Sequence, residues 1–308
     1  MSLTLADVSK LTEDQARETF EHIRWPDGPF CPHCGSVEVT KLQGKAHRPG
    51  LYQCRGCPEQ FTATVNTILE DSHLPIRIWL MAFAILCSAK KGVSALQLQR
   101  QLGLGSYRTA WHLCHRIRHA MSKEPLAGLL GEGGEIVEAD ETYVGGKPRK
   151  GAGPHKGGRS TQKKTPVVAL VQRGGAARSF VTKDATAATL RQVVGKNIDR
   201  SATLMTDEWR PYIIIGREFA RHERVSHEKG EYARKDGSHV NTAESYFALL
   251  KRGIIGSFHH VSPCHLGRYC DEFSFRWNYR QISDSERTFE ALRGTEGRRL
   301  SYRAPTGK

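Results

Sequence analysis

The sequence predicts a multidomain protein in which a small cysteine-rich module and a helical region precede an α/β domain with a mixed sheet. Two Cys-x₂-Cys pairs lie within residues 31–57. Apolar residues recur at helical spacing through residues 76–121, and strand-like runs separated by glycine turns begin near residue 134. We expect an N-terminal segment over residues 1–72, a helical region over 73–127, the α/β domain over 130–285 and a basic tail over 286–308, with a glycine-rich linker at 128–134.

The cysteine spacing predicts a structural metal site in the first module. Cys31 and Cys34 form one pair, Cys54 and Cys57 form the other, and 19 residues separate the two pairs. This spacing is typical of a tetrahedral Cys₄ site for Zn²⁺, in which each tight turn offers two thiolates. Disulfide bonds are the alternative use of four cysteines. We expect a zinc ribbon.

The helical region has the pattern of a helix-turn-helix motif. Residues 76–87 are apolar on most sides, which indicates a buried helix that is too short to cross a bilayer. A second helix is expected from Ser94 to Leu102, and after a glycine turn a third helix starts at Ser106. The third helix would bury its apolar positions and turn basic residues outward, towards a DNA major groove. The candidate DNA-contacting residues on it are Arg108, His112 and Arg116. A plain helical hairpin between two domains is the alternative.

The α/β domain is predicted from short apolar runs that turn residues bound. Strands are expected near Gly134–Val144, Pro166–Arg173, Ala177–Lys183 and Ala202–Asp207, with a hairpin turn at Gly174-Gly175. Helices are expected over Ala185–Val194 and Ala243–Ile254, and the second has an apolar stripe formed by Phe247, Leu250 and Ile254. Strands and helices that alternate in this way predict a mixed sheet with helices on both faces.

Three carboxylates occupy positions from which they could converge. Asp140 lies in the first strand, Asp207 ends a later strand, and Glu244 lies on the helix that follows. Clustered carboxylate oxygens are the ligands that a pair of Mg²⁺ ions needs to cleave and rejoin phosphodiesters. Each acid also has a local explanation. The first two suit solvated turns, and Glu244 suits the capping box of a helix that begins near Asn241.

Four segments together resemble the catalytic domain of bacterial insertion-sequence DDE transposases. They are ADETYVGGK, TDEWRPY, HVNTAESYFALLKRG and HHVSPCHLGRYCDEFSFRWNYR, and the resemblance covers roughly Cys31 to Arg280. The most similar group carries an N-terminal zinc ribbon and is related to the eukaryotic Merlin elements. The resemblance implies an RNase H-like fold, Mg²⁺ held by Asp140, Asp207 and Glu244 with Mn²⁺ able to substitute, and a phosphate contact from Lys251. Some members have asparagine in the third position, so Asn241 is the alternative to Glu244 there.

A transposase of this kind would bind the terminal inverted repeats of its element, cut the 3′ ends and join them to target DNA. The resemblance also implies at least a homodimer on the DNA, because two ends are joined. Two other functions stay open from the sequence. One is a catalytically silent, domesticated DNA-binding regulator, and the other is an RNase H-like nuclease without strand transfer.

The charge balance agrees with double-stranded DNA as the partner. The chain has 46 Lys and Arg against 32 Asp and Glu, a formal net charge of +14, which attracts a polyanion irrespective of its sequence. A basic segment follows Asp140, and Lys147, Arg149 and Lys150 are its candidate phosphate contacts. The first residues lack the apolar stretch of a signal peptide, and the sequence has no apolar run of about 18 residues. We therefore expect a cytoplasmic protein at the nucleoid, without a membrane partner.

Overall fold

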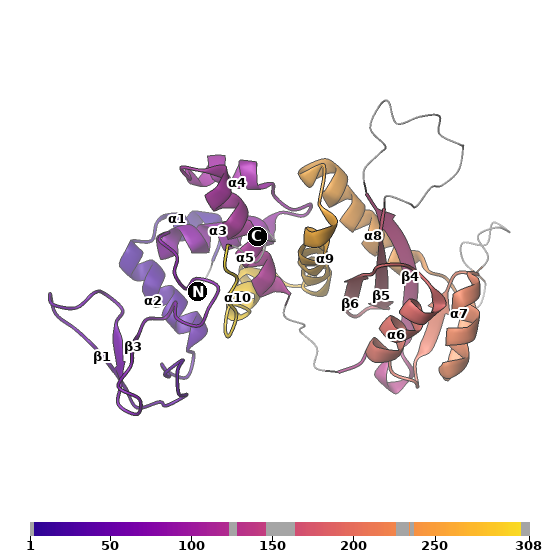
Figure 1. The fold of residues 1–308 in the computed structure, drawn as a ribbon, viewed down its shortest axis with the longest axis horizontal. Helices are drawn as coiled ribbons and strands as arrows, with labels where there is room; N and C mark the ends of the chain where they lie inside the picture. The colour runs from indigo at the N-terminus through magenta and orange to yellow at the C-terminus, as the bar shows by residue number, and fades with distance from the viewer. Residues whose placement is uncertain (1–2, 123–127, 146–163, 226–233, 235–236, 303–308) are drawn as a thin grey trace. The chain divides into compact units, whose positions relative to one another are not determined.

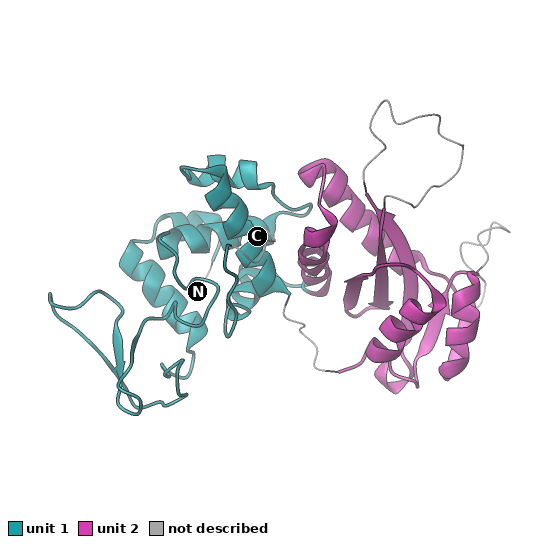
Figure 2. Ribbon diagram, viewed as in Figure 1, with its two compact units in different colours: residues 1–123, 279–308 teal, residues 124–278 magenta. Residues whose placement is uncertain are grey.

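The chain folds into two compact units, and the second is inserted into the sequence of the first (Figure 1, Figure 2). The computed structural model describes residues 3–122, 128–145, 164–225, 234 and 237–302. Unit 1 consists of residues 1–123 and 279–308, and unit 2 consists of residues 124–278. The chain therefore leaves unit 1 once and returns to it for its last helix.

Unit 1 begins with two helices and a small antiparallel sheet. The helices are α1 (Leu5–Ser9) and α2 (Glu13–Arg24), and the strands are β1 (Val39–Lys41), β2 (Tyr52–Cys54) and β3 (Gln60–Phe61). Helix α2 starts at a capping box formed by Thr12 and Gln15. At its end, Trp25 packs edge-on against Tyr52 and Phe61, so an aromatic cluster links α2 to the sheet.

The rest of unit 1 is helical. It contains α3 (Ile76–Ser88), α4 (Ala95–Leu102), α5 (Tyr107–Met121) and α10 (Asp284–Arg293). Helix α3 is buried along most of its length, as its apolar sequence predicted. The helix-turn-helix pattern is present as well. Ser94 caps α4, Gly103 ends that helix with a left-handed φ of 63°, and Ser106 caps α5.

The C-terminal region differs from the basic tail predicted over residues 286–308. Its described part, up to residue 302, begins as helix α10, which packs against α2, α3 and α5. Ser283 and Glu286 form a capping box at its start, a local signal that the prediction of a tail overlooked. Further on, Glu296 pairs with buried Arg24, whose guanidinium also donates to two backbone carbonyls after β3. The returning segment is thus part of the core of unit 1.

Replacing Leu292 by alanine is expected to destabilise unit 1, because this side chain of α10 is only 1% exposed. Truncating a buried leucine costs about 2–5 kcal/mol through lost burial and the cavity left behind. Hydrogen exchange of the amides in α3 and α5 measures the loss. Leu96→Ala, at a side chain of α4 that is 45% exposed, is the control and should change little. Equal exchange rates in the two variants would contradict the packing of α10 on α3.

Unit 2 is built on a five-stranded mixed sheet of order β6-β5-β4-β7-β8. The strands are β4 (Ile136–Val144), β5 (Thr165–Gln172), β6 (Ala177–Val181), β7 (Thr203–Thr206) and β8 (Arg221–Arg224). Strands β4, β5 and β6 pair antiparallel, whereas β7 pairs parallel with β4 and β8 pairs parallel with β7. This is the RNase H-like arrangement that the sequence predicted, although the edge strand β8 was not foreseen.

Helices cover both faces of this sheet. On one face, α6 (Ala187–Asn197) and α7 (Arg210–Ile215) enclose a core with Val137 and Ala139 of β4. On the other, α8 (Asn241–Gly253) and α9 (Pro263–Asn278) enclose a core with Val144 of β4. Short turns complete the unit: η1 (Glu132–Gly134), η2 (Gly216–Glu218) and the π-helical η4 (Ile254–Phe258). Because strand side chains alternate between faces, the position of each acid on β4 decides which helices it meets.

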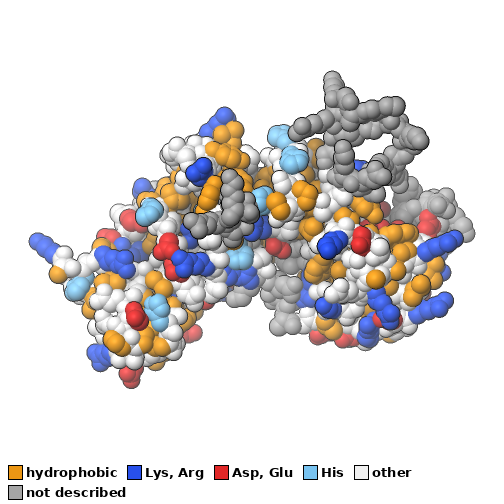
Figure 3. All heavy atoms as spheres, viewed as in Figure 1, with side chains coloured by type: hydrophobic (Ala, Val, Ile, Leu, Met, Phe, Trp, Pro, Cys, Tyr) orange, Lys and Arg blue, Asp and Glu red, His pale blue; other side chains and the backbone are white. Residues whose placement is uncertain are grey.

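Lysine and arginine side chains are spread over the visible face of both units (Figure 3). This distribution agrees with the formal net charge of +14. Within the part of the chain that the structure describes, no helix combines the length and the apolar character needed to cross a membrane.

Candidate active site and metal centres

Asp140 lies on β4, and Asp207 directly follows β7, the parallel strand that neighbours β4. The register of β4 and β7 pairs Glu138 with Met205, and Asp140 and Asp207 each lie two residues further along the chain. Parallel strands present their carboxyl ends on one side, where α/β proteins place their ligands. Together with Glu141, the two aspartates form a group in which one oxygen of each carboxylate lies within 4.8 Å of the others.

Glu141 belongs to this group although its sequence context did not single it out. Strand alternation turns it to the face covered by α7, opposite to that of Asp140. There the fully buried Tyr212 donates its hydroxyl to Glu141 at 2.9 Å. Both faces of one strand thus contribute a carboxylate. The one signal for Glu141 in the sequence was its position next to Asp140, which suits a solvated acidic turn equally well.

Burial and mutual repulsion raise the pKa values of these carboxyl groups. The pKa of Asp140 rises from 3.8 to about 7, first because of burial and then because of the charges of Asp207 and Glu244. The pKa of Glu141 rises to about 8 through burial and the charge of Asp140. The backbone N–H of Glu141 donates to Asp140 at 2.8 Å and lowers the pKa of Asp140, as Lys251 does, without offsetting burial. Such a concentration of negative charge fits a divalent cation that prefers oxygen ligands.

Glu244 and Lys251 lie on the exposed side of α8, as their spacing predicted. Glu244 is not one of the three clustered carboxylates, but its charge is near enough to raise the pKa of Asp140. The capping-box alternative for Glu244 is wrong. The N-cap of α8 is Val240, which has no side-chain cap, and Asn241 is already helical. Asn241 is exposed one turn before Glu244.

The four N-terminal cysteines converge as their spacing predicted. Their sulfur atoms lie within 4.8 Å of one another, with 3.6 Å between Cys31 and Cys57 and between Cys34 and Cys54. None is in a disulfide, so that alternative is wrong. The sulfur of Cys54 accepts hydrogen bonds from the backbone N–H groups of Cys57 and Gly56, which lower the pKa of Cys54 to about 7. Four converging sulfurs with a turn that favours the thiolate fit tetrahedral Zn²⁺.

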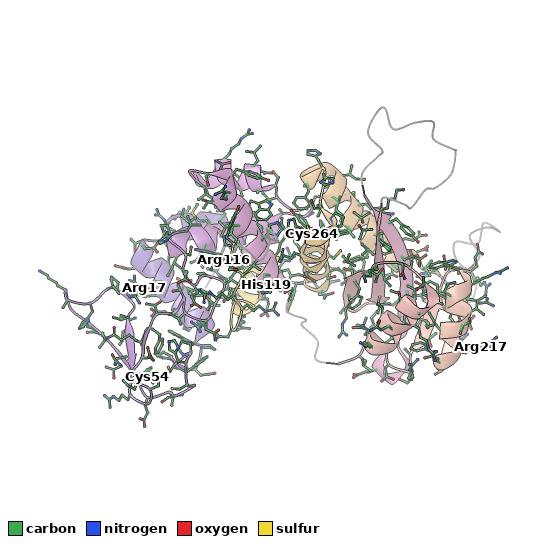
Figure 4. All side chains as sticks on the ribbon, in the orientation of Figure 1. Arg17, Cys54, Arg116, His119, Arg217 and Cys264 are labelled. Atoms are coloured by element: carbon green, nitrogen blue, oxygen red, sulfur yellow. The ribbon has the colours of Figure 1, made fainter. Side chains whose placement is uncertain are left out.

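Two of the three candidate DNA-contacting residues on α5 do not lie on an open face, which corrects the prediction. Arg116, labelled in Figure 4, is 6% exposed, stacks over the ring of Trp79 at 5.1 Å and donates to the carbonyl of Glu70. His112 is half-buried, with one ring nitrogen 3.2 Å from the carbonyl oxygen of Leu300. Burial lowers the pKa of Arg116 to about 10 and also lowers the pKa of His112.

The return of the chain to unit 1 explains the burial of His112, whereas Arg116 is covered by residues before α5. Residues 298–302 lie along α5, where Arg298 donates to the carbonyl of His119 at 2.7 Å and the ring of Tyr302 lies 5.6 Å from the guanidinium of Arg108. Periodicity within α5 cannot reveal a partner such as Leu300, which follows His112 by 188 residues. Arg108 stays exposed in the first turn of α5. The other candidates, Lys147, Arg149 and Lys150, lie outside the described residues.

Comparisons with known proteins cover both sites. A family model described as "ISXO2-like transposase domain" matches residues 129–278, which include Asp140, Asp207 and Glu244. A second, described as "Transposase zinc-ribbon domain", matches residues 11–60, which include the four cysteines. Among curated proteins, the chain is 30% identical over 278 residues to an uncharacterized protein in transposable element ISH50 of Halobacterium salinarum. That match covers 86% of this chain and 91% of the relative.

Proposed function

Because this chain belongs to the family of insertion-sequence transposases that combine a zinc ribbon with an ISXO2-like transposase domain, we propose that it binds the terminal inverted repeats of its element and transfers their 3′ ends to target DNA. The chemistry is Mg²⁺-dependent cleavage of each end, followed by strand transfer. One observation carries the proposal: Asp140, Glu141 and Asp207 meet where β4 and β7 run to one edge of the sheet, with Glu244 close by on α8.

Asp140, Asp207 and Glu244 would hold the metal ions, with Glu141 as a further carboxylate within reach. When bound, Mg²⁺ would activate water for cleavage of the element end and the freed 3′ hydroxyl for strand transfer, and it would stabilise the leaving 3′ oxygen. Mn²⁺ is expected to substitute, because it takes the same oxygen ligands. The chain's own part is to gather the carboxylates on strands whose positions the sheet fixes. No serine or tyrosine nucleophile is assigned, because the 3′ hydroxyl of the element is itself the nucleophile in strand transfer.

Lys251 is assigned to a phosphate of the bound DNA. It follows Glu244 by two helical turns on the same exposed face of α8. Its ammonium group lies 6.0 Å from the ring centre of Phe247 and close enough to Asp140 to lower the pKa of that carboxyl. A cation at this place can pair with a phosphate next to the carboxylates. The helix dipole also favours a lysine near the end of α8.

DNA binding is assigned to the zinc ribbon, the first turn of α5 and the basic segment after β4. Arg108 is exposed at the start of α5, the part of a recognition helix that contacts base edges. Lys147, Arg149 and Lys150 follow β4 in sequence and would bind phosphates. His112 and Arg116 are not assigned to DNA, because they are engaged within unit 1. Joining two ends takes at least two chains, so the active form on DNA would be a homodimer or larger, acting in the cytoplasm at the nucleoid.

The test combines a labelled duplex that ends in the inverted repeat flanking this reading frame with supercoiled target DNA and Mg²⁺. The wild-type protein is expected to nick the repeat end and to form joined products. Asp207→Asn should lower both by about 10³-fold or more, the scale seen when one member of a catalytic group is removed. Asp199→Asn is the matched control. Within the described structure, the carboxylate of Asp199 accepts hydrogen bonds from the backbone N–H and the hydroxyl of Ser201 alone, so the products should be unchanged.

The outcomes separate the other two functions from the proposed one. Nicked ends without joined products would favour a nuclease that lacks strand transfer. Tight binding of the ends without cleavage, in Mg²⁺ and in Mn²⁺, would favour a catalytically silent DNA-binding regulator. Equal products from the wild type and Asp207→Asn would contradict the role assigned to this carboxylate.

A further inference from the structure

Glu138 is a fully buried carboxylate on β4, two residues before Asp140. Its oxygens accept hydrogen bonds from the backbone N–H groups of Thr242 at 2.8 Å and Ala243 at 2.9 Å, and from the hydroxyl of Thr242 at 2.8 Å. Thr242 follows Glu138 by 104 residues and lies in the first turn of α8. A side chain of the sheet thus caps the helix that carries Glu244.

Helix α8 depends on this cap because its own N-cap residue supplies none. The first N–H groups of an α-helix have no partner within the helix, and Val240 at the N-cap position makes no side-chain bond to them. The carboxylate of Glu138 satisfies two of these donors, and its negative charge suits the positive end of the helix dipole. Glu244 follows Ala243 directly, so the turn that is capped is the turn that presents Glu244.

Arg173, the residue after β5, holds Glu138 from another side. Its Nε donates to Glu138 at 2.7 Å, and its other nitrogens donate to the carbonyls of Gly237 at 3.0 Å and His239 at 2.9 Å. The arginine therefore compensates the buried charge of Glu138 and also fixes the segment that leads into α8. Four donated bonds engage the two oxygens of Glu138, and Nδ1 of His239 lies 3.1 Å from one of them. These bonds leave Glu138 poorly placed to bind a metal ion itself.

Glu138 and Asp140 point to the same face of β4, because side chains two residues apart on a strand share a face. This is the face on which α8 packs, and Figure 1 shows α8 beside β4 and β5. Asp140 and Glu244 are both carboxylates and belong to the two elements that Glu138 joins, so their like charges repel each other. Without a tether, this repulsion favours a larger separation of helix and strand whenever no cation is bound. The bonds of Glu138 oppose that separation at the adjacent position.

We propose that Glu138 is a positioning residue that sets the separation of Asp140 on β4 from Glu244 on α8, so that both carboxylates are held ready for cations. The inference rests on the proposed function, in which these carboxylates bind the cations. A simple stabilising ion pair is the plainer role for Glu138, and the two roles differ in one measurable quantity. A stabilising pair changes the free energy of unfolding alone, whereas a positioning residue also changes the cation affinity of the fully folded protein.

The experiment measures the Mn²⁺ affinity of the full chain by electron paramagnetic resonance of the free ion. Glu138→Gln keeps the side-chain volume but removes the charge, and the Mn²⁺ dissociation constant is expected to rise about 10-fold or more, as for other residues that orient metal ligands. Glu138→Asp restores the charge on a shorter side chain and should give an intermediate value.

Glu272→Gln is the matched control. Glu272 is also fully buried in unit 2, and it pairs with Arg276 within α9 at 2.5 Å. Its replacement removes a buried ion pair of the same kind without touching the cap of α8. The melting temperature of this variant should fall, while its Mn²⁺ dissociation constant should equal that of the wild type.

A double-mutant cycle tests whether Glu138 acts through Glu244. In a protein that already carries Glu244→Gln, the further change Glu138→Gln should weaken Mn²⁺ binding by less than about 2-fold, because coupled residues are not additive. Should Glu138→Gln not fold, Thr242→Val takes its place. It removes only the hydroxyl bond to Glu138 and should weaken Mn²⁺ binding by about 2–10-fold.

Three results would overturn the positioning role while the metal site stands. In the first, Glu138→Gln folds and melts at a lower temperature but binds Mn²⁺ as tightly as the wild type. In the second, the effects of Glu138→Gln and Glu244→Gln on Mn²⁺ binding are fully additive. In the third, Thr242→Val binds Mn²⁺ as tightly as the wild type. A wild-type protein that binds no Mn²⁺, or an Asp207→Asn variant that binds it as tightly as the wild type, would overturn the proposed metal site and this inference with it.

Discussion

Asp140→Asn is expected to abolish DNA cleavage and also to raise the melting temperature of unit 2 when no divalent cation is present. Cleavage should fall by about 10³-fold or more, because an amide is a poor substitute for a carboxylate ligand. The melting temperature should rise because burial and the negative charges of Asp207 and Glu244 make the ionised carboxylate of Asp140 unfavourable in the folded protein. A cleavage assay and calorimetry without divalent cations, on one preparation, measure the two effects.

The gain in stability should depend on pH in a defined direction. The pKa of Asp140 in the folded protein, about 7, lies above the ordinary value of 3.8. Below pH 3.8 the carboxyl group is protonated in both states and costs the folded state nothing. As the pH rises towards 7, the unfolded state releases the proton first, so the free energy of unfolding falls. At about 1.4 kcal/mol per pKa unit, the free energy of unfolding falls by several kcal/mol over this range. The wild type and Asp140→Asn should therefore melt most alike in acid and diverge up to neutral pH, and Mg²⁺ should stabilise only the wild type.

Asp184→Asn is the control for the sign of this effect. Asp184 accepts hydrogen bonds from Thr189 and Thr186, which lower its pKa. Its replacement should lower the melting temperature and leave cleavage intact. A comparable loss of stability in Asp140→Asn would contradict the view that this carboxylate is ionised at a cost to the fold.

Cys54→Ser is expected to release the zinc ion, to unfold the ribbon and to abolish binding to the element ends. A structural Zn²⁺ contributes on the order of 10–16 kcal/mol to the folding of such a module. The sheet of β1, β2 and β3 has strands of only two or three residues, so it cannot replace that contribution. Atomic absorption measures the zinc content, and an electrophoretic mobility shift with the inverted-repeat duplex measures the binding.

Cys264→Ser provides the comparison for this prediction. Cys264 is exposed and belongs to neither of the potential metal-ligand groups found among the described residues. This variant should keep its zinc and its DNA binding. Mn²⁺ binding should survive even in Cys54→Ser, because unit 2 has cores of its own. Element ends that still bind after the zinc has gone would show that the ribbon is not required for recognition.

Features that neighbouring residues determine could be predicted from the sequence. Each cysteine pair occupies one tight turn, so spacing alone identified the ribbon. Strands β4 to β7 are short apolar runs between turn residues, and Asp207 directly follows the last residue of β7. The serines that cap α4 and α5 act within their own first turns. In all these cases the interacting groups lie a few residues apart, and a local pattern contains both partners.

Features that depend on distant residues could not be predicted in this way. Arg116 is polar and looks outward on a helical projection, yet it stacks on Trp79 and donates to the carbonyl of Glu70. Glu141 faces away from Asp140 by strand alternation but belongs to the same cluster of carboxylates. The start of α8 resembled a self-contained capping box, whereas its cap comes from Glu138 on β4. Each of these depends on which segments fold together, and periodicity contains no such information.

Because unit 1 is split, the protein completes it late in its own synthesis. Helix α10 packs against α2, α3 and α5, so that core cannot close until residues 284–293 have left the ribosome. All of unit 2 is made in between, and at about 5–20 residues per second this takes on the order of 10 s. A nascent chain can therefore close its ribbon around zinc early, while its helical core waits for the last helix. The unit that carries the clustered carboxylates is finished first, and the helical core of unit 1 is finished last.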